Sequence, residues 1–367
     1  MILMNDFKSE PAELRQAMAD AVQRVLDSGW YILGSELENF EKRWSEVCGV
    51  TFGVGVGNGM DAIEIGLRAL GIGPGDEVIT TPMTAFATVL AILRSGATPV
   101  LADIDPGTAL LSVDSAERCV SAKTKAVILV HLYGQMRSMT TWTRFCENNN
   151  LLLIEDCAQS HLASWGNKTC GSYGVFGAYS FYPTKNLGAV GDAGMIVTDN
   201  IDIAERSTNI RNYGQSIRYE HPIVGMNSRL DEVQAAILSE KLKWLEGQTN
   251  KRREIASAYN LFITNPLIEK LNEPEEYDSH VYHLYVVKVK ARNELLKHLQ
   301  KNEIQTLIHY PIPVHSQLPC REIKRDPMGL GFSEVHASLC ISLPCHPQMT
   351  KDDVRQVIEA VNNFQGV

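Results

Sequence analysis

A lysine in an unusually apolar stretch is the residue of this sequence with the clearest chemical potential. Lys185 lies in the segment AYSFYPTKNLGAVGDAGMIV, residues 178–197, just after a short strand of small and aromatic residues. A lysine held in apolar surroundings loses its proton more readily than one in water, and its free amine can then attack a carbonyl carbon. The alternative is a lysine exposed on a surface turn, where most lysines lie.

Two acids follow a strongly apolar strand earlier in the chain. Residues 151–160 read LLLIEDCAQS, so Glu155 and Asp156 come at the carboxyl end of a strand that is expected to be buried on both faces. Ligands bind at the carboxyl ends of strands in α/β sheets, and a buried carboxylate needs a partner. Three functions fit these acids: a metal ligand, a helix N-cap, or a partner for a protonated ring nitrogen.

The segment VGVGNGMDAIEIGLRAL, residues 54–70, has the pattern of a strand, a glycine turn and a helix. Free N–H groups at the start of such a helix bind phosphate. Gly57, Gly59 and Ala62 also match the G-x-G-x-x-G/A dinucleotide fingerprint, but the acid expected after the second strand is missing, since EVITT is followed by Pro-Met. A single phosphate is therefore favoured over a nicotinamide or flavin cofactor, and a tight turn without a ligand is the alternative.

The three segments follow one another as phosphate turn, strand-end acid and lysine. Pyridoxal 5′-phosphate needs one of each, because its phosphate binds an anion site, its pyridinium nitrogen pairs with a carboxylate, and its aldehyde forms a Schiff base with a lysine. The combination favours the ring-nitrogen partner for Asp156 and a buried amine for Lys185. No H-E-x-x-H metal motif occurs, and we expect no bound metal.

The elements that must position these residues alternate in type between residues 50 and 200. Strands are expected at residues 52–56, 77–81, 98–102, 126–130, 151–155, 178–181 and 194–198, with helices at 60–70, 85–95, 114–120 and 140–148. This alternation predicts a mostly parallel sheet flanked by helices. Outside it we expect helices at 11–27, 36–48, 228–246, 250–263, 292–301 and 351–364, and a half-exposed strand at 283–289. A boundary near residue 245 would separate a large α/β domain, residues 1–245, from a smaller α+β domain, residues 246–367.

Composition excludes several classes of protein. The 367 residues include 34 Lys and Arg and 43 Asp and Glu, a formal net charge of −9 that argues against an extended nucleic-acid-binding surface. No segment reaches the roughly 18 uncharged apolar residues that span a membrane, and the first residues do not read as a signal peptide. Eight cysteines without a C-x-x-C pair are expected to be reduced thiols, as in a cytoplasmic enzyme.

Nine ordered segments resemble the DegT/StrS-type family of nucleotide-sugar aminotransferases. They are SGWYILGSELENFE, GIGPGDEVITTPMTAFAT, GATPVLADID, VHLYGQ, EDCAQS, SFYPTKNLGAVGDAG, RNYGQ, MNSRLDEVQAAIL and HYPIPVHSQ. The resemblance implies the aspartate-aminotransferase fold (fold type I), with a mixed, mostly parallel seven-stranded sheet and a smaller C-terminal α+β domain. It also implies pyridoxal 5′-phosphate as the cofactor.

The resemblance assigns roles to individual residues. Lys185 would form the Schiff base, Asp156 would bind the pyridine nitrogen and Gln159 would reach the ring hydroxyl. The residues that match the substrate-binding regions of relatives are Tyr182, Arg211, Tyr219, His309 and Tyr310.

The phosphate site implied by the resemblance has contributions from two subunits. Ser180 and the amides of Gly59 and Met60 would hold the phosphate from one chain. Asn227 would contact it from the neighbouring subunit, which implies a homodimer with shared active sites. Relatives often have Gly-Thr where this chain has Gly59-Met60. The aromatic residue that stacks on the cofactor ring in relatives directly follows a threonine, where this chain has Ala85, and Phe86 comes one position later. Phe86 would stack on the ring, and a smaller residue covering the ring is the alternative.

The implied activity is a ping-pong transfer of an amino group from L-glutamate to a nucleotide-linked keto-deoxysugar, in which Lys185 carries the proton in both half-reactions. The Asn-Gly-aliphatic-Asp-Ala pattern at residues 58–62 is similar to that of enzymes acting on 3-keto sugars. The 3-keto position of a 6-deoxyhexose is therefore favoured, and a 4-keto sugar is the alternative. Two other classes stay open: a pyridoxal-phosphate-dependent sugar dehydratase, whose relatives have histidine in place of the lysine, and a non-catalytic regulator that binds a sugar or the cofactor.

Overall fold

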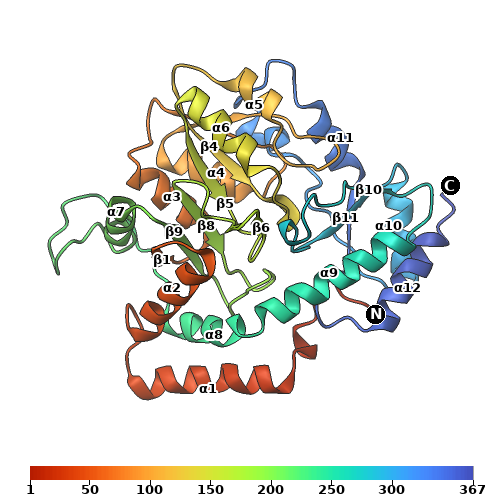
Figure 1. The fold of residues 1–367 in the computed structure, drawn as a ribbon, viewed down its shortest axis with the longest axis horizontal. Coiled ribbons are helices and arrows are strands. Elements are labelled where there is room, and N and C mark those ends of the chain that lie inside the picture. The colour runs from red at the N-terminus through yellow and green to blue at the C-terminus, as the bar shows by residue number, and fades with distance from the viewer. Residues whose placement is uncertain (367) are drawn as a thin grey trace.

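Strands of three sheets form the framework of the computed structural model, which describes residues 1–366 (Figure 1). The largest sheet contains β1 (Phe52–Val56), β2 (Glu77–Thr80), β3 (Thr98–Leu101), β4 (Thr124–Val130), β5 (Leu152–Asp156), β8 (Phe176–Ser180), β9 (Gly194–Thr198) and β12 (Lys324–Arg325). A second sheet contains β10 (Glu269–Lys270), β11 (Tyr285–Lys288) and β13 (Cys340–Leu343), and a third is the short pair β6 (Ser164–Trp165) and β7 (Lys168–Thr169).

The large sheet has the strand order β1-β9-β8-β5-β4-β2-β3-β12. β9 runs antiparallel to both of its neighbours, and the other pairs are parallel. All seven strands expected from the sequence are present, and the predicted mixed, mostly parallel sheet is confirmed. β12 is an eighth strand that was not expected, and the C-terminal part of the chain contributes it.

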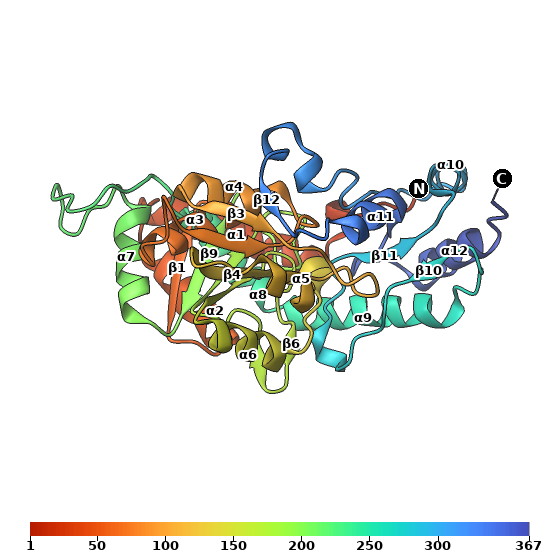
Figure 2. The same cartoon turned by 90° about the horizontal axis from the view of Figure 1, so that it is seen from above.

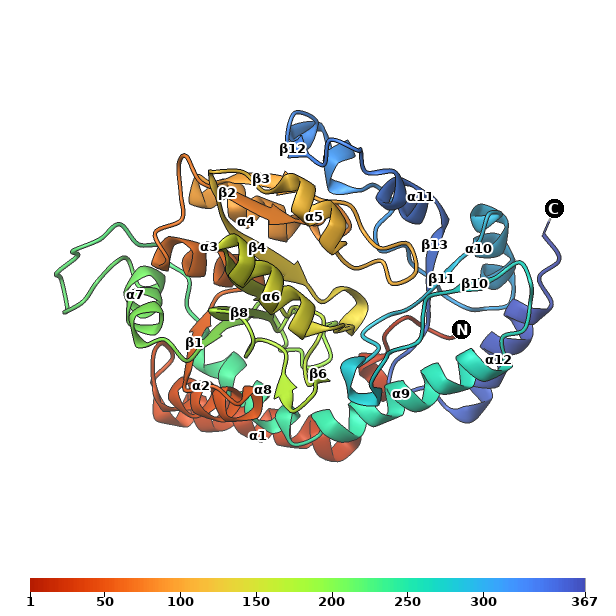
Figure 3. The same ribbon diagram turned by 45° about the horizontal axis from the view of Figure 1, so that its top comes forward.

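Helices cover both faces of this sheet (Figures 1 and 3). The helices of the described chain are α1 (Ala12–Ser28), α2 (Ser35–Cys48), α3 (Gly59–Ala69), α4 (Phe86–Ser95), α5 (Val113–Cys119), α6 (Met139–Asn149), α7 (Ile201–Arg211), α8 (Glu232–Leu242), α9 (Leu245–Phe262), α10 (Arg292–Lys301), α11 (Gly331–Leu339) and α12 (Lys351–Asn362). Short 3-10 helices lie at Phe7–Ser9, Leu132–Gly134, Tyr277–Ser279, Val314–Ser316 and Leu318–Cys320. Among the described residues, no helix combines the length and the apolar character needed to cross a membrane.

The continuous apolar run in β4 follows from burial on both faces. Val127 and Leu129 pack into the core shared with α2, α5 and α6, whereas Ala126 and Ile128 pack into the core shared with α3 and α4. Successive side chains of a strand point to opposite faces. The run therefore records two helical layers, as expected for a parallel strand in an α/β protein.

The smaller sheet packs with α9, α10 and α12 beside the large sheet, and Figure 2 shows the N-terminus at the same end. The division expected near residue 245 falls at the start of α9. Two segments cross it, because Ile2 pairs with Ile304 and β12 pairs with β3. The domain boundary remains a prediction.

Two local predictions in this part of the chain are wrong. The helices expected at 228–246 and 250–263 are α8 and α9, which are separated at Lys243 and Trp244 rather than near residue 248. β11 is buried along its whole length, not half-exposed. The reason is that Val286 packs into the core of the large sheet while Val287 packs into the core of the smaller one.

A glycine sets how closely α3 approaches the large sheet. A Cβ on Gly66 would lie 2.3 Å from the Cζ atom of Phe176 in β8. The ring of Phe176 is completely buried, so it has little room to move. This contact lets α3 pack closely against β8.

Replacing Gly66 with Ala is therefore expected to destabilise the fold, although alanine favours helix formation. Overpacking a dense core costs about 1–3 kcal/mol, which exceeds the roughly 1 kcal/mol of helix propensity gained. Urea unfolding of Gly66→Ala measures this loss. The matched control is Gly247→Ala in α9, where an added Cβ meets nothing within 4 Å, and it should stabilise by about 0.4–1 kcal/mol. A stabilising Gly66→Ala would contradict the close packing.

Candidate functional site

Lys185 lies in a tight turn that follows β8. Its backbone N–H donates to the carbonyl of Tyr182 over 2.8 Å, and a Cβ on Gly188 would lie 2.3 Å from the carbonyl oxygen of Pro183. Burial lowers the pKa of the Lys185 amine to about 8, although the nearby carboxylate of Asp156 acts to raise it. Lys185 is half-buried, so the structure places its amine in largely apolar surroundings rather than fully exposed on a surface turn.

Asp156 ends β5, is only 5% exposed, and lies close enough to Lys185 to act on its charge. Its Oδ2 accepts a hydrogen bond from Thr88 Oγ1 at 2.8 Å, and its Oδ1 accepts from the Ala158 N–H at 3.1 Å. The hydroxyl of Thr84 bonds that of Thr88 at 2.8 Å. No helix begins at this point of the described chain, so the helix-cap interpretation of Asp156 is wrong. Sequence analysis missed both threonines, whose only signal is their spacing of four residues.

Glu155 points to the other face of β5 and forms a fully buried pair with His131, with 2.9 Å between Oε2 and Nε2. Its carboxylate also accepts the backbone N–H groups of Gly171, Tyr173 and Gly174 at 2.8–2.9 Å. Burial alone would raise the pKa of Glu155, but His131 and these N–H groups lower it below its ordinary value. Burial would lower the pKa of His131, but Glu155 raises it.

His131, Glu155 and Cys157 place ligand-type atoms within 4.8 Å of one another, the spacing of a metal site. Both carboxylate oxygens of Glu155 and the Nε2 of His131 already form hydrogen bonds. A metal ion would have to displace these bonds and leave the backbone donors unpaired in a buried site. The group therefore fits a structural hydrogen-bond network better than a metal centre.

Gln159 is oriented by two tyrosines. Its Oε1 accepts the backbone N–H of Tyr133 at 2.6 Å, and its Nε2 donates to the hydroxyl of Tyr310 at 3.2 Å. Burial, and then the charge of Asp156, raise the pKa of Tyr310 to about 12. Burial lowers the pKa of the neighbouring His309 to about 4, with a further contribution from Lys185. The structure thus brings the predicted residues of the C-terminal part beside Asp156, Gln159 and Lys185.

The glycine turn before α3 provides free backbone donors. The Asn58 side chain caps the helix by accepting the Asp61 N–H at 2.9 Å. Within residues 1–366, the N–H groups of Gly59 and Met60 have no acceptor. A Cβ on Gly59 would lie 2.6 Å from the Cβ of Ser180, so only glycine lets this turn approach β8. The two amides and Ser180 therefore form a cradle for an anion.

These groups fit pyridoxal 5′-phosphate. The cradle at Gly59 and Ser180 would hold its phosphate, Asp156 would meet its ring nitrogen and Lys185 would form the covalent link. The amine of Lys185 makes no hydrogen bond or salt bridge with any other described residue, which leaves it available for that link. Gln159 keeps its expected place, but its two polar atoms are already bonded to tyrosines.

The other predicted substrate residues lie at different places in the single chain. Arg211 is buried, where it pairs with Glu41 and donates to the carbonyl of Gly55 at 2.8 Å. In the single chain its guanidinium thus serves the packing of α7 on β1, and the prediction that it meets the substrate stays a prediction. Tyr182 is about half-exposed next to the lysine turn, and Tyr219 is 78% exposed on the loop between α7 and α8. Figure 1 shows this loop projecting from the body of the chain.

Phe86, for which stacking on the cofactor ring stays a prediction, packs beside the C-terminal segment in the single chain. It begins α4 and shares a helix face with Val89, three residues later, and both pack into a small cluster that includes Val314 and Leu330. Thr88 occupies a different face of α4 and bonds Asp156. The structure therefore assigns Phe86 to packing between α4 and the C-terminal segment.

His161 is a residue of the site that sequence analysis missed. It is completely buried among the rings of Trp44, Tyr179 and Phe181, with centroid distances of 5.4–5.6 Å. Neither ring nitrogen has a hydrogen-bond partner within the described chain. Burial, and then the charge of Lys185, lower its pKa to about 3. The ring is therefore neutral and close to the lysine.

Comparison with known proteins identifies relatives over nearly the whole chain. Residues 12–362 match the sequence model of the DegT/DnrJ/EryC1/StrS aminotransferase family. The chain is 43% identical over 364 residues to the dTDP-3-amino-3,6-dideoxy-alpha-D-galactopyranose transaminase of Aneurinibacillus thermoaerophilus, with 99% of each protein covered. It is also 39% identical to a pleiotropic regulatory protein of Geobacillus stearothermophilus, with 98% of each covered.

Among solved structures, the chain is similar to the X-ray crystal structure of S. venezuelae DesV in complex with a ketimine intermediate. The TM-score is 0.94 and the sequence identity 38%, with 99% of this chain and 97% of that chain covered. At this coverage the similarity includes both the large sheet and the smaller C-terminal part.

The buried His131–Glu155 pair leads to a prediction about stability. Glu155→Gln should lower the free energy of unfolding by about 3–5 kcal/mol, the cost of breaking a buried ion pair. The pKa of Glu155 is lowered from 4.5, so its contribution is present above pH 4.5 and is lost as pH falls through the lowered pKa. The pKa of His131 is raised from 6.5, so its contribution is present below pH 6.5 and is lost as pH rises through the raised pKa.

The difference in the free energy of unfolding between wild type and Glu155→Gln should therefore be largest between pH 4.5 and 6.5. Urea unfolding at a series of pH values measures it. Arg355→Ala is the control, because it removes an ion pair whose side chains are 69% and 81% exposed, and it should change little at any pH. A gap that stays constant from pH 4 to pH 9 would show that the pair is not ionised.

Proposed function

We propose that this chain, which belongs to the DegT/DnrJ/EryC1/StrS aminotransferase family, transfers the amino group of L-glutamate to the 3-keto position of a nucleotide-linked 6-deoxyhexose. Membership of the family confirms the expected fold class, the aminotransferase activity and pyridoxal 5′-phosphate as the cofactor. The observation that supports the proposal is the half-buried Lys185, whose amine has a lowered pKa and feels the charge of Asp156, together with the anion cradle at Gly59 and Ser180.

The choice of sugar follows from the relatives and from one sequence pattern. The relative with 43% identity is a transaminase of a dTDP-3-amino-3,6-dideoxy sugar, and residues 58–62 carry the Asn-Gly-aliphatic-Asp-Ala pattern. Asn58 caps the helix whose first amides form the cradle, and its Nδ2 donates to the carboxylate of Asp61. Both observations favour a dTDP-linked 3-keto-6-deoxy sugar over a 4-keto sugar.

Bound pyridoxal 5′-phosphate supplies an electron-accepting ring that takes up the electron pair released when a C–H bond beside nitrogen breaks. Lys185 receives that proton at its Nζ and returns it, which serves both half-reactions of a ping-pong transfer. Its pKa of about 8 leaves part of the amine unprotonated near neutral pH. The carboxylate of Asp156 would accept a hydrogen bond from the protonated ring nitrogen of the cofactor. Thr88 and Ala158 hold this carboxylate in position.

Residues around the lysine fix geometry rather than carry charge. The amides of Gly59 and Met60, with the hydroxyl of Ser180, hold the phosphate. Gln159, whose amide is oriented by Tyr133, would lie toward the cofactor ring. Tyr310 and His309, brought in by the C-terminal part, supply polar groups for the sugar, while Tyr182 and Tyr219 remain candidates for the nucleotide.

A regulatory function without catalysis has one relative in its favour, the pleiotropic regulatory protein. This chain nevertheless has Asp156, Gln159, Ser180 and Lys185 together, a set that binding alone does not require. Lys185 also argues against a sugar dehydratase, because related dehydratases have a histidine at the position of this lysine. All eight cysteines are free, and a cytoplasmic location forms part of the proposal.

We also propose a homodimer with shared active sites. Apolar side chains are exposed on segments close to the lysine turn: Trp30 is 63%, Tyr31 50% and Val190 58% exposed. These segments adjoin the start of α8, because Ile32 pairs with Asp231 and the Val190 N–H donates to Gln234. Asn227 is exposed just before α8. A second copy of the chain would bury this surface and bring an Asn227 toward the neighbouring phosphate site.

The proposed activity predicts turnover of a defined substrate. The protein supplied with pyridoxal 5′-phosphate, L-glutamate and a dTDP-3-keto-6-deoxyhexose should release 2-oxoglutarate and the 3-amino sugar in equal amounts, measured by mass spectrometry. Lys185→Ala should reduce the rate by about 10³-fold or more, whereas Lys168→Ala, on an exposed hairpin, should leave it unchanged. Amination of only 4-keto sugars would favour the alternative substrate, and amination of neither would favour a regulator.

Shared active sites predict complementation between two inactive variants. Lys185→Ala and Asn227→Ala, tested at limiting cofactor, should each have low activity. In a hybrid dimer one site carries both changes and the other carries neither. An equal mixture refolded together should therefore regain about a quarter of the wild-type activity. No recovery, with mixed dimers present by native mass spectrometry, would show that Asn227 acts within its own chain.

A further inference from the structure

We infer that Asn186 and His283 are positioning residues for Lys185: together they fasten the lysine turn to the chain segment that enters the smaller sheet. The inference rests on the proposed function, because it gives a role to residues that act through the lysine. Asn186 follows Lys185 directly in the chain, whereas His283 lies 97 residues from Asn186.

Asn186 makes two hydrogen bonds, both to the segment that precedes β11. Its Nδ2 donates to the carbonyl of Val281 at 3.2 Å, and its Oδ1 lies 3.2 Å from Nδ1 of His283. Both Asn186 and His283 are buried, with exposed fractions of 6% and 9%. Since water cannot easily replace these partners, loss of the amide leaves two buried polar groups unpaired.

The chemistry of the partners determines which atoms carry hydrogen. A backbone carbonyl only accepts, so the Nδ2 of Asn186 must face Val281, and the Oδ1 must face His283. The Nδ1 of His283 must then carry a proton. Burial, followed by the charges of Lys185, Arg252 and other neighbours, lowers the pKa of His283 well below its ordinary value. His283 is therefore a neutral ring with its hydrogen on Nδ1.

The segment that holds Asn186 is itself fixed on several sides. The Val281 N–H donates to the Gly134 carbonyl at 2.9 Å, and the Leu284 N–H donates to the Tyr133 carbonyl at 3.3 Å. Arg252 in α9 donates to the His283 carbonyl at 3.5 Å. Residues 280–284 therefore join the lysine turn, the turn that orients Gln159, and α9.

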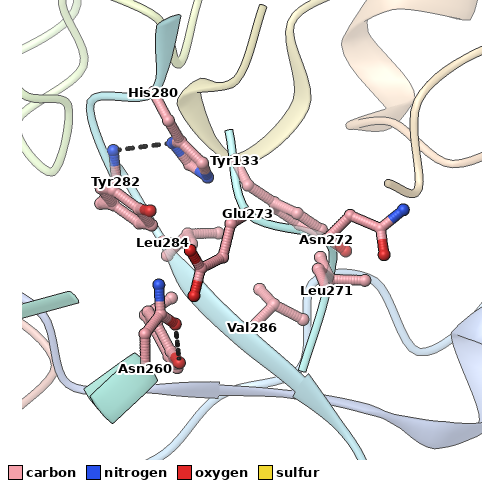
Figure 4. A pocket seen from close by; sticks show the side chains of 10 residues that line it. Tyr133, Asn260, Leu271, Asn272, Glu273, His280, Tyr282, Leu284 and Val286 are labelled. Carbon is pink, nitrogen blue, oxygen red and sulfur yellow. Dashed lines mark hydrogen bonds between the residues drawn. The ribbon is translucent and has the colours of Figure 1, made fainter. Parts of the chain in front are cut away.

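The two sides of this segment have different partners. Figure 4 shows His280, Tyr282 and Leu284 lining a small cavity, where the His280 ring stacks on Tyr282 at 3.8 Å. Val281 and His283 are absent from this lining and instead meet Asn186. The segment is packed on its cavity side and hydrogen-bonded on the lysine side, so it is a firm support for the turn.

A loosened lysine turn would expose the half-buried amine further to water. The groups whose charges act on Lys185 or respond to it are Asp156 and the rings of His161, His283 and His309. Because burial is the cause of the low pKa of Lys185, hydration would raise that pKa toward the ordinary lysine value of about 10.4. The amine would also lose its alignment with the reacting carbon.

The test measures the amine directly in the full-length chain freed of cofactor. Trace acetylation with acetic anhydride across pH, followed by peptide mapping, should give Lys185 a midpoint near 8 in the wild type. Asn186→Ala should move the midpoint up by at least about one pH unit. In the reconstituted enzyme, kcat should fall by about 10- to 100-fold while the KM for glutamate changes much less.

Two replacements of His283 separate a positioning role from general packing. Asn places an N–H donor near the position of Nδ1, so His283→Asn should behave like the wild type. Gln reaches the position of Nε2 instead, so His283→Gln should behave like Asn186→Ala. Asn265→Ala is the matched control, because Asn265 is a buried amide that donates to the carbonyls of Val361 and Phe364 at 2.9 and 2.7 Å. It should lower the melting temperature without moving the Lys185 midpoint.

An unchanged midpoint in folded Asn186→Ala, or identical behaviour of the two His283 variants, overturns the inference. If Asn186→Ala does not fold by circular dichroism, the His283 pair decides. A wild type that shows the expected labelling pattern but aminates no keto sugar supports the positioning role and overturns the substrate assignment instead.

Discussion

Partial desolvation of one amine is the constraint on which the rest of this site depends. A fully hydrated Lys185 would be protonated and inert near neutral pH, and the protein packed around it lowers its pKa to about 8. The large sheet alone does not provide that burial. Its strands supply Asp156 and Ser180, but His283 and His309 come from the C-terminal part. The two parts of the chain must therefore be assembled before the lysine acquires its chemistry.

One strand serves two purposes because its side chains alternate. At the end of β5, Asp156 faces Thr88 and the lysine, whereas Glu155 faces His131 and three backbone N–H groups. The first acid is available to a ligand, and the second is fully used by the protein. Two adjacent carboxylates avoid mutual repulsion in this way, since each has its own donors on its own side of the sheet.

Local sequence patterns were enough to predict the fold and to propose the main residues of the site. Apolar runs such as AVILV identified the strands, and Gly59, Asp156 and Lys185 each lie where a strand ends. Features that depend on contacts between distant residues could not be predicted in this way. Arg211 pairs with Glu41, 170 residues away, and β11 is buried because cores form on both of its sides. Thr88 is 68 residues from Asp156, and no local pattern joins them.

The register of β5 has a consequence for how such chains can diverge. Inserting or deleting one residue within this strand would exchange the faces of Glu155 and Asp156. Glu155, which accepts the Gly171 N–H, would then face the site of the ring nitrogen, and Asp156 would face His131 instead. Point replacements can accumulate here gradually, but length changes cannot. Evolution of this family is thus expected to confine indels to surface connections and leave the strand's residue count untouched.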